Sequence, residues 1–93
     1  MEQLHRQIID LQRKWRDHLD DPNNSGARQV DSAIQRLEDD IQTNKNPRSI
    51  EDQVKRLLQQ LNSLENTSVM DNSHLNDLQR SFESMRDSLR KLM

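Results

Sequence analysis

Apolar residues recur at alternating spacings of three and four along four segments of this chain. The first series is Met1, Leu4, Ile8, Leu11 and Trp15. The last series is Leu75, Leu78, Phe82, Met85, Leu89 and Leu92. Side chains with this spacing lie on one face of an α-helix, and a mean step of about 3.5 residues keeps that face toward a neighbouring helix. The pattern predicts an all-α fold with narrow, coiled-coil-like seams.

Two further stripes lie between these segments, and polar breaks separate them. Residues 21–26 combine Pro22 and Gly26 with Asp and Asn residues, so one helix should end there and the next should begin at Asn24 or Ser25. Residues 44–47 break the pattern again, with Pro47 as a first-turn residue or Ser49 as N-cap of the third helix. We expect helices over residues 2–20, 25–44, 48–65 and 72–92.

The joint at residues 66–73 admits two interpretations. The apolar spacing continues through it in register, but the stripe positions are the polar residues Ser68 and Asp71. A single helix over residues 50–93 is one possibility, which would give two short helices and a long one completed by dimerisation. Because Asn, Thr and Ser form helices poorly, we favour a loop, with Val69 and Met70 folding over the end of an antiparallel four-helix bundle formed by one domain, residues 1–93.

Composition predicts a thin core. Apolar residues make up 30% of the chain, close to the two in seven of a coiled-coil seam and below the three in seven of a globular helix. Small cores give marginal stability, so we expect the chain to form a homodimer or to bind another helical protein. Apolar residues outside the stripes could supply the contacts: Ile9, Leu19, Leu58, Val69 and Met70.

Charge and apolar run length limit the classes of partner. The 14 basic and 16 acidic residues are interleaved, which disfavours nucleic acid and anionic membranes. Apolar runs reach only two residues, too few to span a bilayer. The first residues have neither the basic flank nor the apolar stretch of a secretory signal, so we expect a cytoplasmic protein.

No residue pattern points to catalysis. The segment from Asp21 to Gly26 resembles half of a calcium-binding EF-hand loop, but position 12 of that loop, which needs a bidentate glutamate, is Ser32. We interpret this segment as an ordinary turn. His18 lies at a seam position, where a polar group often fixes helix register. We therefore predict no catalytic residue, metal, cofactor or small-molecule substrate, and expect that the protein is not an enzyme.

The function that remains is a non-catalytic protein–protein interaction module, such as an adaptor, assembly factor or small regulator. Helices of this kind bind partners by placing apolar anchors into grooves. We predict Ile9 with Trp15 on the first helix, and Leu58 with Leu61 on the third, as contact residues. The alternative is a nucleic-acid-binding regulator that uses basic residues of the same two helices, namely Arg13, Lys14, Arg16, Lys55 and Arg56.

Overall fold

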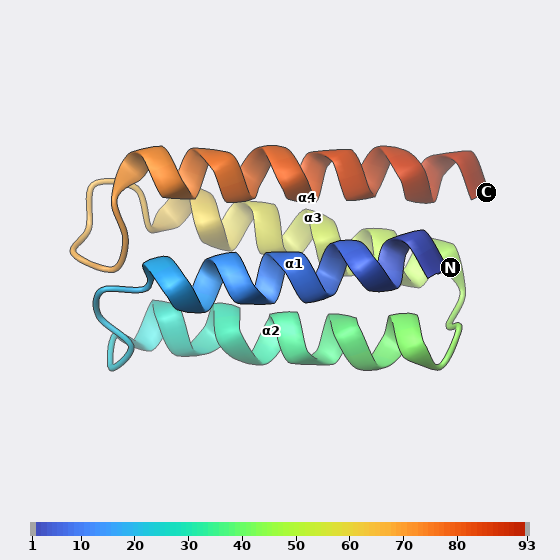
Figure 1. The fold of residues 1–93 in the computed structure, drawn as a ribbon, viewed down its shortest axis with the longest axis horizontal. Coiled ribbons are helices and arrows are strands. Elements are labelled where there is room, and N and C mark those ends of the chain that lie inside the picture. Colours follow the sequence, from blue (N-terminus) through green and yellow to red (C-terminus); the bar gives the residue numbers. More distant parts are fainter. Residues whose placement is uncertain (1, 93) are drawn as a thin grey trace.

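The computed structural model describes residues 2–92, which form four α-helices and no strand in that span. Helix α1 covers Glu2–His18, α2 covers Ser25–Gln42, α3 covers Pro47–Ser63 and α4 covers Asn72–Leu92 (Figure 1). The all-α prediction is confirmed. Helix α3 ends at Ser63 and α4 begins at Asn72, with a loop between them, so the long single helix over residues 50–93 is wrong.

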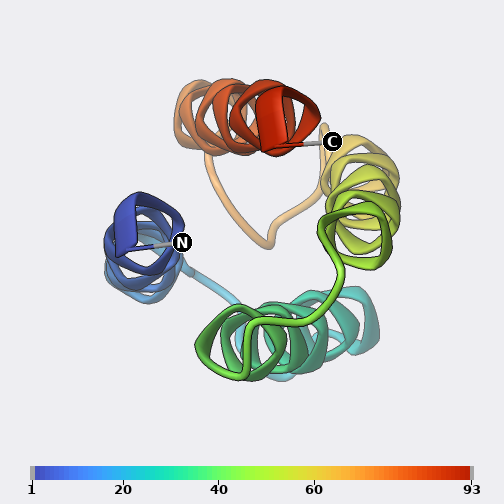
Figure 2. The ribbon, with the colours of Figure 1, turned by 90° about the vertical axis from the view of Figure 1, so that its right-hand side faces the viewer.

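The four helices form a ring in which each helix contacts its two neighbours. The neighbouring pairs among the described residues are α1–α2, α2–α3, α3–α4 and α1–α4, whereas the backbones of the diagonal pairs lie farther apart. Viewed end-on, successive helices run in opposite directions around a common centre (Figure 2). The result is an antiparallel arrangement about 36 Å long and 19 Å across, whose central space is filled by the four apolar stripes.

Asparagine side chains cap the N-termini of two of the helices. The Asn24 Oδ1 accepts hydrogen bonds from the backbone N–H groups of Gly26 and Ala27 at 2.8 and 3.3 Å. The Asn46 Oδ1 accepts one from Arg48 at 3.0 Å, and Pro47 occupies the first helical position. These bonds satisfy N–H groups that have no partner within the helix. The turn at residues 21–26 is therefore explained by capping.

The first three helices end two residues earlier than the sequence suggests. At the end of α2, the backbone N–H groups of Asn44 and Lys45 donate to the carbonyls of Ile41 and Asp40 at 3.2 and 3.0 Å. Asn44 has a φ of 55°. A residue with positive φ and this pair of hydrogen bonds constitute a Schellman motif, which turns the chain out of the helix.

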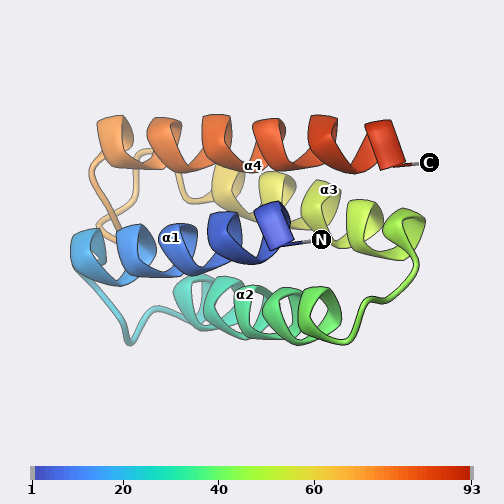
Figure 3. The ribbon, with the colours of Figure 1, turned by 45° about the vertical axis from the view of Figure 1, so that its right-hand side comes forward.

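The α1–α2 and α3–α4 connections lie together at one end of the molecule, here named the closed end (Figure 3). Val69 and Met70 are buried there at 0% and 2% exposure, so the 64–71 loop folds over the core as predicted. The Asp20 backbone N–H donates to the Val69 carbonyl at 2.8 Å and joins the two connections. This bond draws residues 19 and 20 away from a continuing α1.

The core is thicker than the composition suggests. Twenty-one apolar side chains of the described residues are buried in one cluster, and Leu19, Ala33 and Leu58 pack against it in part. Nearly every apolar side chain is therefore covered within one chain. The expectation that Val69 and Met70 remain available as external contacts is wrong, because both belong to this core.

Candidate interaction site

The four predicted contact residues divide into two accessible and two inaccessible side chains. Trp15 and Leu61 are 1% and 0% exposed, and both lie inside the four-helix core. Ile9 is 41% exposed on α1, and Leu58 is half-buried between α3 and α4. A partner that docks on the intact protein can therefore reach Ile9 and the edge of Leu58, but neither Trp15 nor Leu61.

Trp15 is fixed by a polar contact as well as by packing. Its indole Nε1–H donates to the Asp31 Oδ1 of α2 at 3.1 Å. A buried indole N–H needs such an acceptor, because an unpaired donor away from water is costly. Trp15 thus joins α1 to α2 from within.

Ile9 lies in a row of arginines on the outer side of α1. Helical spacing places Arg6, Arg13 and Arg16 three before, four after and seven after Ile9. All three arginine side chains are exposed. Arg6 pairs with Glu2 at 3.1 Å, whereas Arg13 and Arg16 form no ion pair among residues 2–92. We name these four side chains, Arg6, Ile9, Arg13 and Arg16, the Ile9 face.

The environment of Leu58 is different. It borders a hollow of about 240 Å³ between α3 and α4, together with Gln59, Asn62, Gln79 and Glu83. Part of the Leu58 side chain packs on the core. This hollow offers one apolar edge among neutral amides and carries a single carboxylate, so it has little charge with which to select a partner.

The basic residues of the nucleic-acid alternative do not share one surface. Arg13, Lys14 and Arg16 belong to α1, whereas Lys55 and Arg56 belong to α3. These two helices are diagonal in the ring, and their backbones are not neighbours. Lys14 and Lys55 are also paired with carboxylates on their own helices, at 3.4 and 3.0 Å. A single phosphate-binding surface made of all five residues is therefore not formed.

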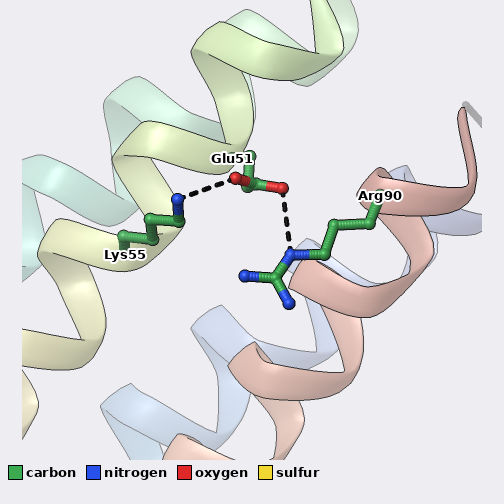
Figure 4. Close-up of polar contacts among 3 residues, drawn as sticks. All are labelled: Glu51, Lys55 and Arg90. Carbon is green, nitrogen blue, oxygen red and sulfur yellow. Dashed lines mark hydrogen bonds and ion pairs between the residues drawn. The ribbon is translucent and has the colours of Figure 1, made fainter. Parts of the chain in front are cut away.

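Among the residues that the structure describes, Glu51 is the one charged residue that is buried, with 6% exposure. Its carboxylate accepts from Lys55 Nζ of the same helix at 3.0 Å and from Arg90 Nε of α4 at 3.3 Å (Figure 4). The hydrogen bond from Lys55 is the main reason that the pKa of Glu51 is lowered, with the positive charges of Lys55 and Arg90 adding to it and burial opposing it. The three side chains connect α3 to α4.

Two histidines meet at the closed end. The rings of His18, the last residue of α1, and His74, in the first turn of α4, stack with centroids 3.7 Å apart and planes inclined by 9°. Sequence reasoning placed His18 at a seam, but it could not identify His74 as its neighbour. Parallel stacked rings direct their nitrogens sideways, away from the space between them, so the pair does not pinch an ion between its planes.

Within residues 2–92, no three His, Cys, Asp or Glu side chains gather to hold a metal ion. A hollow of about 360 Å³ along α2 and α3 is lined by Ser32, Gln60, Arg28, Arg36, Gln29 and Ala33. Its lining offers Ser32 no histidine or carboxylate as a general base. In the same span, every helix is too short or too polar to cross a membrane.

Comparison of the chain with protein families, with curated proteins and with solved structures finds no match.

Proposed function

We propose that this protein is a non-catalytic protein–protein interaction module that binds its partner through the Ile9 face. The supporting observation is Ile9 itself, 41% exposed between arginines while nearly all other large apolar side chains of residues 2–92 are buried. Among the large apolar side chains of that span, only Leu92, at 53%, is more exposed than Ile9. A rigid bundle that presents one apolar anchor within a cationic row has the features of a helix-docking surface.

Charge complementarity specifies the partner. Arg13 and Arg16 have no carboxylate partner among the described residues, so a binding protein can supply one. An amphipathic helix with a small apolar anchor flanked by Asp and Glu would cover Ile9 and pair with both arginines. Such rim charges raise the association rate and select the partner, whereas the buried anchor slows dissociation.

A paired substitution tests this proposal. Ile9→Asp removes the anchor and adds a negative charge, and Leu92→Asp makes the same chemical change at the other exposed apolar side chain. Because both positions are exposed, both variants should keep the helical circular dichroism and thermal stability of the parent. Proteins captured by the parent and by Leu92→Asp, but lost with Ile9→Asp, support the Ile9 face. Partners retained by Ile9→Asp and lost with Leu92→Asp contradict it.

Salt dependence separates this proposal from nucleic-acid binding. Phosphate contacts release counterions, so nucleic-acid affinity falls steeply as salt rises. If the arginines bind phosphates, Arg13→Glu with Arg16→Glu should abolish binding to duplex DNA or RNA, and Ile9→Gln should leave it nearly unchanged. A protein partner held by an apolar anchor should instead be weakened by Ile9→Gln and should tolerate moderate salt.

A further inference from the structure

The stacked imidazoles of His18 and His74 form a contact between helices that a proton can alter. The two ring centroids are 3.7 Å apart, and both side chains are half-buried. Imidazole is the side chain that gains a proton just below neutral pH. Two imidazolium rings at this separation repel each other, whereas two neutral rings, or one neutral and one charged ring, can remain stacked.

The surroundings do not neutralise a second charge. Neither imidazole forms an ion pair with a carboxylate within the described span of the chain. The charged residues within one turn of either ring along the chain are Lys14, Arg16, Asp17, Asp20, Asp21, Asp71 and Asp77. Lys14 and Arg16 add positive charge, and Lys14 is already paired with Asp10. The carboxylates form no ion pair with either ring and act from beyond contact distance, where solvent weakens their effect.

The helix ends distinguish the two rings. His18 is at the C-terminus of α1, where the helix dipole favours a positive charge, and His74 is in the first turn of α4, where the dipole opposes one. A positive charge on both rings at once is therefore opposed by the facing imidazolium and, at His74, by the α4 dipole.

We propose that the His18–His74 stack is an acid-sensitive latch of the closed end. The pair holds α1 against α4 while it carries no more than one proton, and the second proton separates the rings. Separation loosens the adjoining connections, which are joined by the single backbone hydrogen bond between Asp20 and Val69 at 2.8 Å. The side chains beneath, Val69 and Met70, are buried at neutral pH and would become accessible in mild acid.

Amide hydrogen exchange at Asp20 reports this opening directly. We expect the protection factor of the Asp20 N–H, corrected for the intrinsic rate, to fall about tenfold or more between pH 7.5 and pH 5.0, as charge repulsion at short range predicts. Amides at the centre of α2 and α3 should keep their protection, because the opening is local. The pH range of this experiment does not reach the protonation of Glu51, because the pKa of Glu51 is lowered from 4.5.

Matched glutamine variants identify the groups responsible. His18→Gln and His74→Gln each leave a single imidazole at the site, so the acid-induced loss of Asp20 protection should disappear in both. His5→Gln is the control, because His5 contacts Gln42 on another side of α1 and its loss should leave the effect intact. Unchanged Asp20 protection in the parent, or an equal loss in either single variant, overturns the proposal.

Titration of the parent followed by NMR gives a second measurement that needs no variant. Nuclear Overhauser effects between the ring protons of His18 and His74 should be present at pH 7.5 and lost at pH 5.0, because the rings no longer stack once they separate. Overhauser effects between the two rings that persist at pH 5.0 would overturn the latch.

Discussion

At the scale of single residues, two polar contacts join neighbouring helices through side chains that lie far apart along the chain. Glu51 and Arg90 are 39 positions apart, and Trp15 and Asp31 are 16 apart. Each pair joins two neighbouring helices. The apolar periodicity locates the core face of each helix but contains no information on which polar flank faces which neighbour. This is why the sequence placed Trp15 on the apolar stripe of the first helix but gave no sign of the role of Glu51.

Substitution of Glu51 should separate the effect of its charge from that of its packing. Glu51→Gln should lower the melting temperature, because the ion pairs are lost and a buried amide must face the Lys55 and Arg90 donors. Glu51→Met should recover that loss or exceed the parent, since a packed apolar side chain often replaces a buried ion pair without cost and both basic side chains can turn to water. Glu83→Gln, on an exposed part of α4, serves as control. A Met variant less stable than the Gln variant would contradict this interpretation.

The effect of Glu51 should depend on pH in a defined direction. Because its pKa is lower in the folded protein than the ordinary value of 4.5, the unfolded chain binds this proton more readily. The stabilisation by Glu51 is therefore complete above about pH 4.5 and is lost as the pH falls through the lower, folded value. We expect the difference in melting temperature between the parent and Glu51→Gln to be constant from pH 7 to pH 5.5 and to shrink by pH 3. A difference that grew on acidification would contradict it.

Trp15 should contribute to stability rather than to partner binding. Trp15→Phe removes the hydrogen bond to Asp31 and leaves a small void, so we expect a loss of about 2 kcal/mol in the free energy of unfolding. Urea denaturation measures it. Asp31→Ala should cost less in the Trp15→Phe background than in the parent, because the indole N–H that it would leave unpaired is already absent. Equal costs in the two backgrounds would show that the hydrogen bond contributes nothing.

At the scale of elements, local chemistry decides where the helices begin and end. Asn24 and Pro47 lie at the starts of α2 and α3 as predicted, whereas the N-cap of α3 is Asn46 and not Ser49. The ends were harder to predict, because an asparagine can lie inside a helix or, with a positive φ, just after its end, and the residue type alone does not decide between the two. The loop after α3 shows the same limit. The apolar spacing continues through it, yet α3 ends at Ser63, and the backbone N–H groups of Leu64 and Glu65 donate to the carbonyls of Leu61 and Asn62.

Asn44 offers a test of such a helix end. At a φ of 55°, glycine has no Cβ to clash, whereas alanine in this conformation costs about 1–2 kcal/mol. We expect Asn44→Gly to keep or slightly raise the free energy of unfolding and Asn44→Ala to lower it by about 1 kcal/mol, measured by urea denaturation. Ser49→Ala, on the exposed first turn of α3, is a nearby control. Alanine that stabilised the protein more than glycine would exclude the Schellman motif.

At the scale of the whole molecule, the enclosed core alters the expectation about association. Ile9 and Leu92 are the large apolar side chains left exposed among residues 2–92, and two separate side chains cannot cover the roughly 800 Å² per partner of a stable dimer. We therefore expect the isolated protein to sediment as a monomer from about 1 to 100 µM. A homodimer with a dissociation constant of about 1 µM or less would be visible in this range as a rise in mass. A concentration-dependent rise in mass that Ile9→Asp abolishes would instead assign the Ile9 face to self-association.

The ring of helices also has a consequence for how the protein is made. Helix α1 has two neighbours, α2 and α4, and the second of these is the last of the four to leave the ribosome. While the chain grows, α2 can cover one side of α1, but the side that later meets α4 stays open until residues 72–92 have been synthesised. The nascent chain thus carries an unclosed apolar stripe for most of its translation, and helper proteins that shield such stripes would act on α1 at this stage.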